Sequence, residues 1–365
     1  MDLETFKKLP LGGVDRRALI GLLQDQGAAA AERVLATQRA RMKPHGVKIA
    51  EDAVVLFLGG SNGITRSLAA QLALGEGVAV AGVHYDSAKM QIGVHHVAAL
   101  QAAAKEAGVD CTFFNQDATK DKVIAEVVGV LKERYRAVHL INGIAAGATK
   151  RYEKYGPCQV RDLDMAFDPV LQIPDFEHAE GYRMLGLVDV ETANEAEIER
   201  TNKFMGTSSL LWAEPLAEAG LLVKGESVVA FCDYDYPPDD PVYAMGPLAG
   251  AKVLQRETMA QIAERFGART VRLCYPAMPT TALGAIPGGS LMYALTGQIL
   301  AERGQWRSVD QLAAETMALW ADPAPAAELR LDDDYQATLP EFYQRRDALT
   351  PADVPQAFSG LFATA

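Results

Sequence analysis

The hydrophobic positions of the chain gather into short runs that are separated by stretches with helical spacing. Largely apolar runs lie at 53–59, 78–83, 111–115, 137–142, 226–232 and 270–275. Runs of this length, bounded by turn signals, are typical of strands buried on both faces of a parallel sheet. Helical periodicity appears between them, at 64–74, 97–107, 121–134 and 250–266. The alternation predicts an α/β fold, a doubly wound parallel sheet of the Rossmann type.

Two regions fall outside this alternation. Residues 1–50 have a polar opening and an Ala-rich helix expected from about Asp15 to Arg41, which we interpret as an N-terminal helical extension. Residues 51–365 are then predicted to form a single Rossmann-type catalytic domain. Within it, residues 150–200 are rich in Pro, Asp, Glu and Tyr and carry only a weak strand signal at 169–174. We expect an insertion there, on the carboxyl side of the sheet, covering the substrate.

Composition narrows the class of protein. The 365 residues include 35 Lys and Arg against 47 Asp and Glu, a net charge of −12 that disfavours nucleic acid as a partner. The four cysteines lie far apart without a CxxC pair, which argues against a zinc site and a secreted disulfide framework. No apolar run is long enough to span a membrane, and the first residues show no export signal. We therefore expect a cytoplasmic protein that acts on small molecules.

A glycine-rich loop, GGSNG, occupies residues 59–63 between the first strand and the first helix. At this turn of a Rossmann sheet, backbone N–H groups and the helix N-terminus hold the pyrophosphate of a dinucleotide. Thr65 stands where many such loops carry a further glycine. The residues expected to contact the cofactor here are Gly59, Ser61, Asn62, Gly63 and Ile64.

Acidic residues after the next strands suggest which dinucleotide binds. Asp86 follows the second strand, where a carboxylate accepts hydrogen bonds from both ribose hydroxyls and repels a 2′-phosphate, so NAD(H) is favoured over NADP(H). Asp117, after the third strand, fits a contact with the adenine edge, and capping of the following helix is the alternative. The other predicted cofactor contacts at these strand ends are Ala118, Asn142 and Gly143.

Tyr243 and Lys252 are the candidate catalytic pair. They lie nine residues apart after the fifth strand, and the helix that carries the lysine is expected to start after Pro247. A phenol with a nearby ammonium can stabilise an oxyanion. The lysine would hold the nicotinamide ribose and lower the pKa of the tyrosine. On spacing alone, a buried core tyrosine and a surface lysine remain the alternative.

These residues resemble the motifs of one known family, the trans-2-enoyl-CoA and enoyl-ACP reductases with a Tyr-x8-Lys motif. VYAMGPLAGAK is similar to the family's IYxxGxIGxAK, with identities at Tyr243, Gly246, Ala251 and Lys252. Further stretches agree in EIERTNKFMGTSSLLWAEPLAEAGLL, in TTALGAIP and in RLDDD. The identities in the first two are Met205, Gly206, Trp212, Ala219, Gly220, Thr280, Ala282, Ala285, Ile286 and Pro287.

The resemblance implies a short-chain dehydrogenase-like fold and NADH-dependent reduction of the C2=C3 double bond of a trans-2-enoyl thioester. Tyr243 would donate to the thioester carbonyl and stabilise the enolate, and Lys252 would hold the ribose. Thr280 and Ala282 would contact the nicotinamide and pyrophosphate side. The acyl group would be carried by coenzyme A or by an acyl carrier protein, and the pathway would be fatty acid or polyketide metabolism.

The chain departs from the family pattern around the expected acyl pocket. The family's YSLASP appears here as NGIAAG, so that Asn142 replaces a tyrosine, and a second family tyrosine falls on Asp233. Two other functions therefore stay open. A ketoreductase or alcohol dehydrogenase of the short-chain type would need a serine where the chain has Ala230. A sensor that binds NAD(H) without turnover is the third. We interpret the acidic residues 233–240 as a solvated loop and expect no metal.

Overall fold

The computed structural model describes residues 16–86, 91–164, 167–168, 170–171, 173–174, 183–280, 283–321 and 327–354. Its centre is a seven-stranded sheet in which all pairs are parallel. The order across the sheet is β11-β10-β9-β4-β1-β2-β3. The strands are β1 (Ala53–Leu58), β2 (Val80–His84), β3 (Cys111–Asn115), β4 (Ala137–Asn142), β9 (Val228–Asp233), β10 (Arg269–Cys274) and β11 (Glu328–Arg330). The predicted doubly wound α/β fold and its six predicted strands are confirmed.

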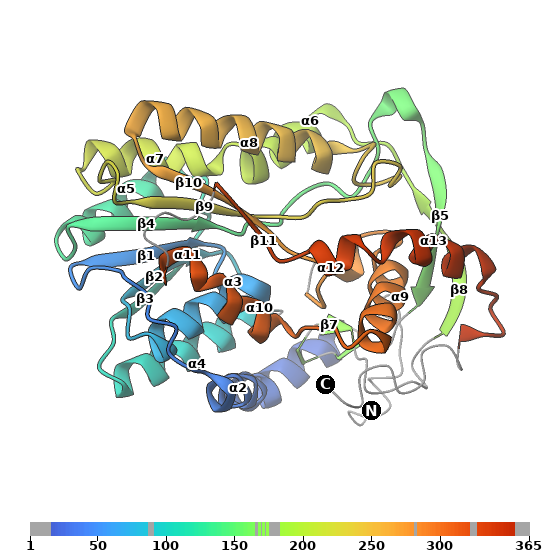
Figure 1. Cartoon of the computed structure of the whole chain (residues 1–365), viewed down its shortest axis with the longest axis horizontal. Helices are drawn as coiled ribbons and strands as arrows, with labels where there is room; N and C mark the ends of the chain where they lie inside the picture. Colours follow the sequence, from blue (N-terminus) through green and yellow to red (C-terminus); the bar gives the residue numbers. More distant parts are fainter. Residues whose placement is uncertain are drawn as a thin grey trace.

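Helices cover both faces of the sheet, as Figure 1 shows. One face carries α3 (Gly63–Ala70), which continues as the π-helical turn η2 (Gln71–Gly75), with α4 (Gly93–Glu106) and α10 (Val309–Thr316). The other face carries α5 (Asp121–Lys132), α7 (Ser208–Glu218) and α8 (Pro247–Phe266). Every residue of β1 and β4 is buried. This two-sided burial is why these strands read as continuous apolar runs in the sequence.

The insertion predicted at residues 150–200 contains an antiparallel hairpin of β5 (Cys158–Asp164) and β8 (Arg183–Val190), after the short helix η3 (Glu153–Tyr155). The weak strand signal at 169–174 corresponds only to β7 (Ile173–Pro174), which pairs with β6 (Phe167–Asp168). Asp162 of the hairpin accepts backbone N–H bonds from Gly288 (2.9 Å) and Leu291 (3.1 Å). These bonds tie the hairpin to the start of α9 (Gly289–Glu302), beside which it lies in Figure 1.

The remaining helical elements lie outside the segments for which the hydrophobic pattern predicted a helix. They are α6 (Glu195–Thr201), η5 (Asn202–Gly206), η6 (Leu283–Ala285), α11 (Ala318–Ala321), α12 (Asp333–Gln336) and α13 (Leu339–Ala348). α6, η5 and α7 follow one another almost without interruption and lead back to the sheet. α9 lies beside the hairpin, and α12 and α13 pack against α9 (Figure 1).

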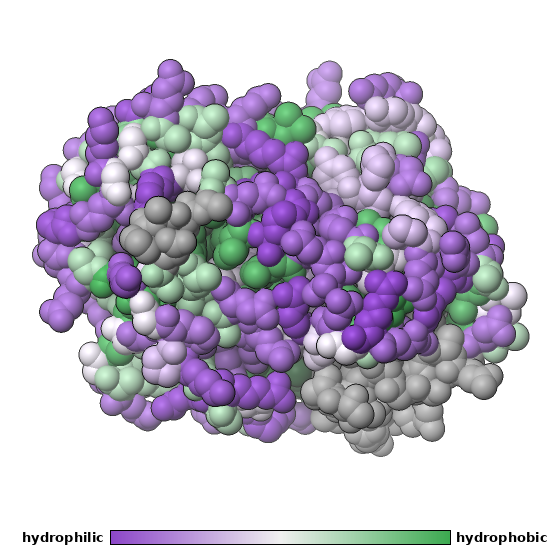
Figure 2. Space-filling view, viewed as in Figure 1, coloured by the Kyte–Doolittle hydropathy of each residue, from purple (hydrophilic) through white to green (hydrophobic). Residues whose placement is uncertain are grey.

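The predicted N-terminal helix is α2 (Arg16–Arg41), which packs on α4 through the buried side chains of Leu23 and Ile92. The Gln38 amide also donates to the Ser67 carbonyl of α3 (2.8 Å). The division into an extension (1–50) and one catalytic domain (51–365) stays a prediction. Within the described residues, no helix combines the length and hydrophobicity required to cross a membrane. Figure 2 shows hydrophilic residues over most of one face, with hydrophobic ones in patches between them.

Candidate active site

A cleft of about 840 Å³ opens along the carboxyl ends of the central strands and collects most of the predicted site. Tyr243 and Lys252 lie on its wall together with the glycine loop. The predicted cofactor contacts that line it are Gly59, Ser61, Asn62, Gly63, Ile64, Asp86, Asp117, Ala118, Gly143, Lys252 and Thr280. Residues that are 193 positions apart in the chain, such as Gly59 and Lys252, thus meet at one edge of the sheet. Ala282 lies outside the described residues.

The glycine loop places a helix N-terminus against the cleft. α3 begins at Gly63, whose φ of +57° favours glycine. Asn62 occupies the N-cap position, but its side chain makes no capping bond. The first N–H groups of α3 are therefore available to an anion, as expected of a pyrophosphate site.

Thr65 replaces the further glycine of many such loops, and the structure accommodates it locally. Its hydroxyl donates to the carbonyls of Gly59 (2.7 Å) and Asn62 (3.1 Å) and so closes the loop. Its methyl group packs on Gly143, where an added Cβ would overlap Thr65 Cγ2. The close approach that a glycine normally allows on the helix is thus provided by Gly143, at the end of β4.

Asp86 is fixed at the end of β2. Its carboxylate is 7% exposed and bonds His84 Nδ1 at 2.8 Å. Its backbone exchanges two hydrogen bonds with the Asn115 side chain, at 2.9 and 2.8 Å. The carboxylate therefore has a defined place at the cleft wall, where the prediction put the adenosine ribose.

Asp117 also lines the cleft but does not cap α5, whose N-cap residue is Lys120. Its Oδ1 accepts from the backbone N–H (2.9 Å) and hydroxyl (2.8 Å) of Thr119 and shapes the turn before the helix. The neighbouring carbonyl of Ala118 accepts from Trp212 Nε1 of α7 at 2.9 Å. The capping alternative for Asp117 is not what the structure shows.

Asn142 is the exception among the predicted cofactor contacts, because its side chain does not reach the cleft. It is buried behind the loop, and its amide donates to the hydroxyls of Ser208 (2.8 Å) and Ser209 (2.9 Å). Its Oδ1 accepts the backbone N–H of Ile144 (3.1 Å), so it orders the loop after β4. The polar residue at this strand end faces inward because two serines of α7 satisfy it there.

This placement predicts a loss of stability in Asn142→Ala. The substitution leaves buried hydroxyls and the Ile144 N–H without their partner, which typically costs about 1–3 kcal/mol. We expect the free energy of unfolding, measured in denaturant, to fall by about this amount. A variant as stable as the parent protein would contradict the hydrogen-bond assignment.

Tyr243 is held in the turn before α8, which begins at Pro247 with Gly246 at the N-cap. Asp240 Oδ1 accepts the backbone N–H groups of Val242 (2.9 Å) and Tyr243 (2.6 Å). The ring packs between Tyr234 and Tyr236, with centroid distances of 5.1 and 5.6 Å. No hydrogen bond from the Tyr243 hydroxyl to another described residue is present, so it can donate to a ligand in the cleft.

Lys252 approaches the same wall from the second turn of α8 and is not a surface lysine. Its side chain is 8% exposed, and Nζ donates to the Cys232 carbonyl at 2.9 Å. Nζ also lies 3.3 Å from Asp233 Oδ1 and from Gln255 Oε1. The tyrosine and the lysine therefore both line the cleft, and the part of the alternative that made Lys252 a surface residue is wrong.

The expected effect of Lys252 on Tyr243 is corrected by the structure. Burial raises the pKa of Tyr243 well above the usual value of tyrosine, and the negative charges of Asp240 and Asp233 raise it further. The charge of Lys252 is directed at Asp233 instead. The phenol is thus a protonated donor at neutral pH and not a site prepared for ionisation.

A partly buried ion network beside the pair was not predicted. Asp233 joins Lys252 to Arg272 of β10 (2.6 Å from Nε) and Arg256 of α8 (3.1 Å). Arg272 also pairs with Asp235. The signal in the sequence was an arginine inside the otherwise apolar strand TVRLCY, next to a strand that ends in aspartate.

A second cavity, of about 440 Å³, adjoins the cleft. The residues common to both are Tyr243, Ile286, Gly289 and Met292. Its other walls come from the β5–β8 hairpin, α9, α13 and the loop at 239–241, and its apolar side chains are Val160, Leu187, Leu291 and Phe342. Tyr243 thus stands between the cleft and an adjoining space of mixed apolar and polar lining.

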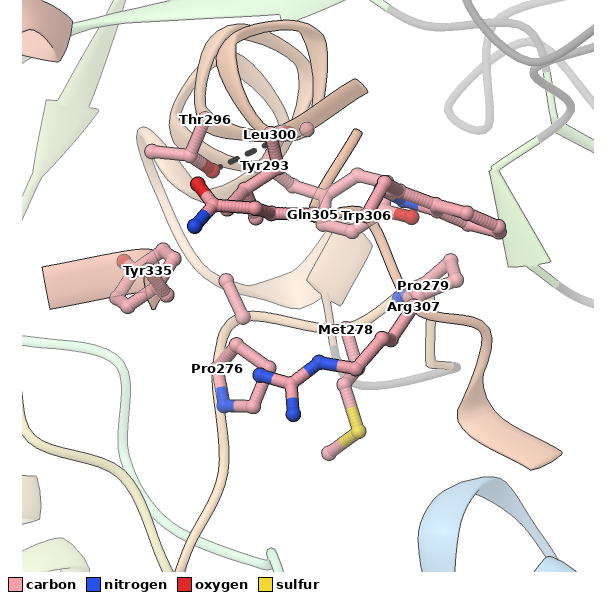
Figure 3. Close-up of a pocket in the computed structure, with 12 residues that line it drawn as sticks. Pro276, Met278, Pro279, Tyr293, Thr296, Leu300, Gln305, Trp306, Arg307 and Tyr335 are labelled. Atoms are coloured by element: carbon pink, nitrogen blue, oxygen red, sulfur yellow. Dashed lines mark hydrogen bonds between the residues drawn. The ribbon is translucent and has the colours of Figure 1, made fainter. Parts of the chain in front are cut away.

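A smaller cavity, shown in Figure 3, lies behind the cleft wall that follows β10. Pro276 and Met278 line both this cavity and the cleft, and Tyr293 and Thr296 of α9 face them (Figure 3). Its volume of about 20 Å³ suffices for about one water molecule. It is too small to be a ligand site. Among the described residues, no cluster of His, Cys, Asp and Glu suited to a metal ion occurs.

Comparison with known proteins identifies the family to which the chain is similar. Residues 89–319 match the model of the trans-2-enoyl-CoA reductase catalytic region. The chain is 30% identical over 246 residues to an enoyl-[acyl-carrier-protein] reductase [NADH] of Streptomyces avermitilis, covering 62% of this chain and 58% of that protein. It is also 30% identical to the enzyme of that name from Tolumonas auensis, covering 68% of this chain and 64% of that protein. It thus spans less than two thirds of these relatives.

The fold agrees with this assignment. The crystal structure of Clostridium acetobutulicum trans-2-enoyl-CoA reductase in complex with NADH superposes with a TM-score of 0.77 at 18% identity, covering 92% of this chain and 88% of that one. The predicted resemblance is therefore confirmed, and the family match covers well over half of the chain. The chain belongs to the trans-2-enoyl-CoA reductase family.

Proposed function

We propose that the protein reduces the C2=C3 double bond of a trans-2-enoyl thioester with NADH. The observation that carries this proposal is the meeting of the Tyr243 hydroxyl and the Lys252 ammonium with the glycine loop in one cleft of a member of this family. The curated relatives are named NADH-dependent enoyl reductases, which supports the choice of reaction and cofactor.

The cleft fits NADH. The uncapped N-terminus of α3 would hold the pyrophosphate, Asp86 the adenosine ribose and Lys252 the nicotinamide ribose. NADH supplies the hydride that the β-carbon of the substrate accepts. The remaining predicted contacts, Ser61, Ile64, Asp117, Ala118, Gly143 and Thr280, would line the dinucleotide.

The substrate would enter through the second cavity, whose apolar side chains suit an acyl chain. Tyr243, at the boundary of the two spaces, would donate its proton in a hydrogen bond to the thioester carbonyl oxygen. Negative charge collects on this oxygen as the β-carbon accepts hydride, so the bond is strongest in the transition state. Protonation at the α-carbon then gives the saturated acyl thioester, carried by coenzyme A or an acyl carrier protein.

The short-chain ketoreductase is the alternative, and one observation weighs against it. The position that would have to supply a second carbonyl donor is Ala230, which is fully buried inside β9 and has no polar side-chain atom. A ketoacyl carbonyl would therefore meet a single donor. The NAD(H) sensor is disfavoured by the placement of both Tyr243 and Lys252 at the cleft.

The direct test offers NADH with a panel of crotonyl, hexenoyl and dodecenoyl thioesters and follows NADH absorbance. We expect turnover of at least one enoyl thioester and none of 3-ketoacyl thioesters. Turnover of a ketoacyl thioester with all enoyl thioesters inert would support the ketoreductase. Tight NADH binding without either turnover would support the sensor.

Loss of the lysine should weaken the binding of the cofactor. We expect Lys252→Ala to raise the Kd of NADH about 10- to 100-fold, because a charge-assisted hydrogen bond contributes about 1.5–3 kcal/mol. Turnover should fall as well. Fluorescence titration measures the affinity, with Lys132→Ala, an exposed lysine at the end of α5, as the control. Unchanged NADH affinity in Lys252→Ala would remove this lysine from the cofactor site.

A further inference from the structure

Asp233, the last residue of β9, is a carboxylate with no exposed side-chain surface, placed among three cations. Oδ1 lies 3.3 Å from Lys252 Nζ, and Oδ2 lies 2.6 Å from Arg272 Nε and 3.1 Å from Arg256 Nη2. Burial alone would raise the pKa of Asp233, but these three cations outweigh it and bring the pKa to about 2. Asp233 is therefore an anion throughout the working range of pH.

The surroundings of Lys252 hold its ammonium and leave one donor for a ligand. An ammonium has three N–H donors, and Nζ donates to the Cys232 carbonyl and to Gln255 Oε1, while Asp233 Oδ1 lies within ion-pair distance. A lysine has a flexible stem of four carbons, which does not fix the position of its charge. These acceptors hold Nζ against the cleft wall.

Asp233 is the acidic member of the ion network that also pairs with Lys252. Among the described residues it is the only carboxylate paired with Lys252, whereas the two arginines have other acidic partners. Asp235 pairs with both Arg256 (3.7 Å) and Arg272 but does not reach Lys252. The carboxylate of Asp233 therefore holds the lysine in a way that no other described carboxylate does.

We propose that Asp233 is a positioning residue that orients the Lys252 ammonium toward the nicotinamide ribose. The inference rests on the proposed function, because it assigns Lys252 to the bound dinucleotide. Asp233 acts through Lys252, so its loss lowers the affinity for the cofactor and not the affinity for the acyl substrate. Without the carboxylate, Nζ loses its ionic anchor and is repelled by Arg256 and Arg272, which remain close by.

The first test compares Asp233→Asn with Asp235→Asn. Both substitutions keep the side-chain shape and remove one negative charge from the same network, but only Asp233 contacts Lys252. We expect Asp233→Asn to raise the Kd of NADH about tenfold, the loss of one charge-assisted bond, and Asp235→Asn to leave it close to that of the parent protein. Asp233→Asn should also raise the KM for NADH without raising the KM for the enoyl thioester. Equal losses in both variants, or a parallel rise of both KM values, would show a merely structural role.

The second test is a double-mutant cycle with Lys252→Ala. If Asp233 acts through the lysine, Asp233→Asn adds no further loss of NADH affinity in the Lys252→Ala background. Fully additive losses would overturn the proposal. Should Asp233→Asn fail to fold, the charge-balanced pair Asp233→Asn with Arg256→Met is compared with Arg256→Met alone. The proposal requires the same tenfold difference there, and its absence contradicts the proposal.

These outcomes are separable from those of the proposed reaction. Parent protein that binds NADH but reduces no enoyl thioester refutes the reaction, while the affinity comparison still decides the role of Asp233. Conversely, enoyl reduction with unaltered NADH affinity in Asp233→Asn leaves the reaction intact and refutes the positioning role.

Discussion

Replacing Tyr243 by phenylalanine is expected to lower kcat for enoyl thioester reduction by about 10²- to 10³-fold, the usual cost of removing one oxyanion donor. The substitution removes the only part of the side chain that can donate to the developing enolate and leaves the ring between Tyr234 and Tyr236. NADH affinity should be retained, because the cofactor is assigned to Lys252 and the glycine loop. Steady-state kinetics and a fluorescence titration measure the two quantities.

Tyr236→Phe is the matched control for this prediction. Tyr236 stacks on the Tyr243 ring but does not line the cleft, so its hydroxyl should contribute little to kcat. A Tyr243→Phe variant with nearly full kcat, or an equal loss in both variants, would mean that the Tyr243 hydroxyl does not stabilise the transition state. Because burial and nearby carboxylates raise the pKa of Tyr243, the parent protein should show no loss of activity from its ionisation near neutral pH.

The second large effect is discrimination between NADH and NADPH. A 2′-phosphate would meet the Asp86 carboxylate, which is held by His84 and can turn away only by breaking that bond. Two unit charges of like sign at 4 Å repel by about 4 kcal/mol at an effective dielectric constant of about 20, before screening by salt. We therefore expect a preference for NADH in kcat/KM of up to about 10³-fold at low ionic strength.

Substitution of the carboxylate checks the cause of this preference. Asp86→Ser should narrow the gap between the two cofactors, chiefly by improving kcat/KM with NADPH. Asp121→Asn removes the same charge from the first turn of α5 and should leave the ratio unchanged. Equal kcat/KM with both cofactors in the parent protein would contradict the assignment of Asp86.

The sheet could be predicted from the sequence because its central strands are buried on both faces. β1 and β4 read as unbroken apolar runs, and the helices between the strands keep their periodicity. The β5–β8 hairpin could not be predicted in the same way. It lies apart from the central sheet, and its apolar residues Leu187 (64% exposed) and Val188 are exposed. The positions of its apolar residues therefore do not mark its buried face. β11 has three residues, too few for a pattern.

The site was predictable to the extent that it lies at strand ends. The glycine loop, Asp86, Asp117 and Gly143 begin within two residues of a strand end, and the carboxyl edge of a parallel sheet collects such residues. Asn142 shows the limit of this rule, since the direction of a strand's last side chain depends on what packs behind it. The network around Asp233 depends on the register that pairs it with Cys274 and on α8 above it, which no local pattern encodes.

The measurement that tests the central claim most directly follows the transferred hydrogen. The protein is incubated with a trans-2-enoyl thioester and NADH that carries deuterium at its transferable position, and the product is analysed by mass spectrometry and NMR. We predict a saturated acyl thioester with a single deuterium at the β-carbon, formed at a much lower rate by Tyr243→Phe. A product that retains the double bond, or deuterium found only on a carbinol carbon formed from a ketoacyl thioester, would contradict the account.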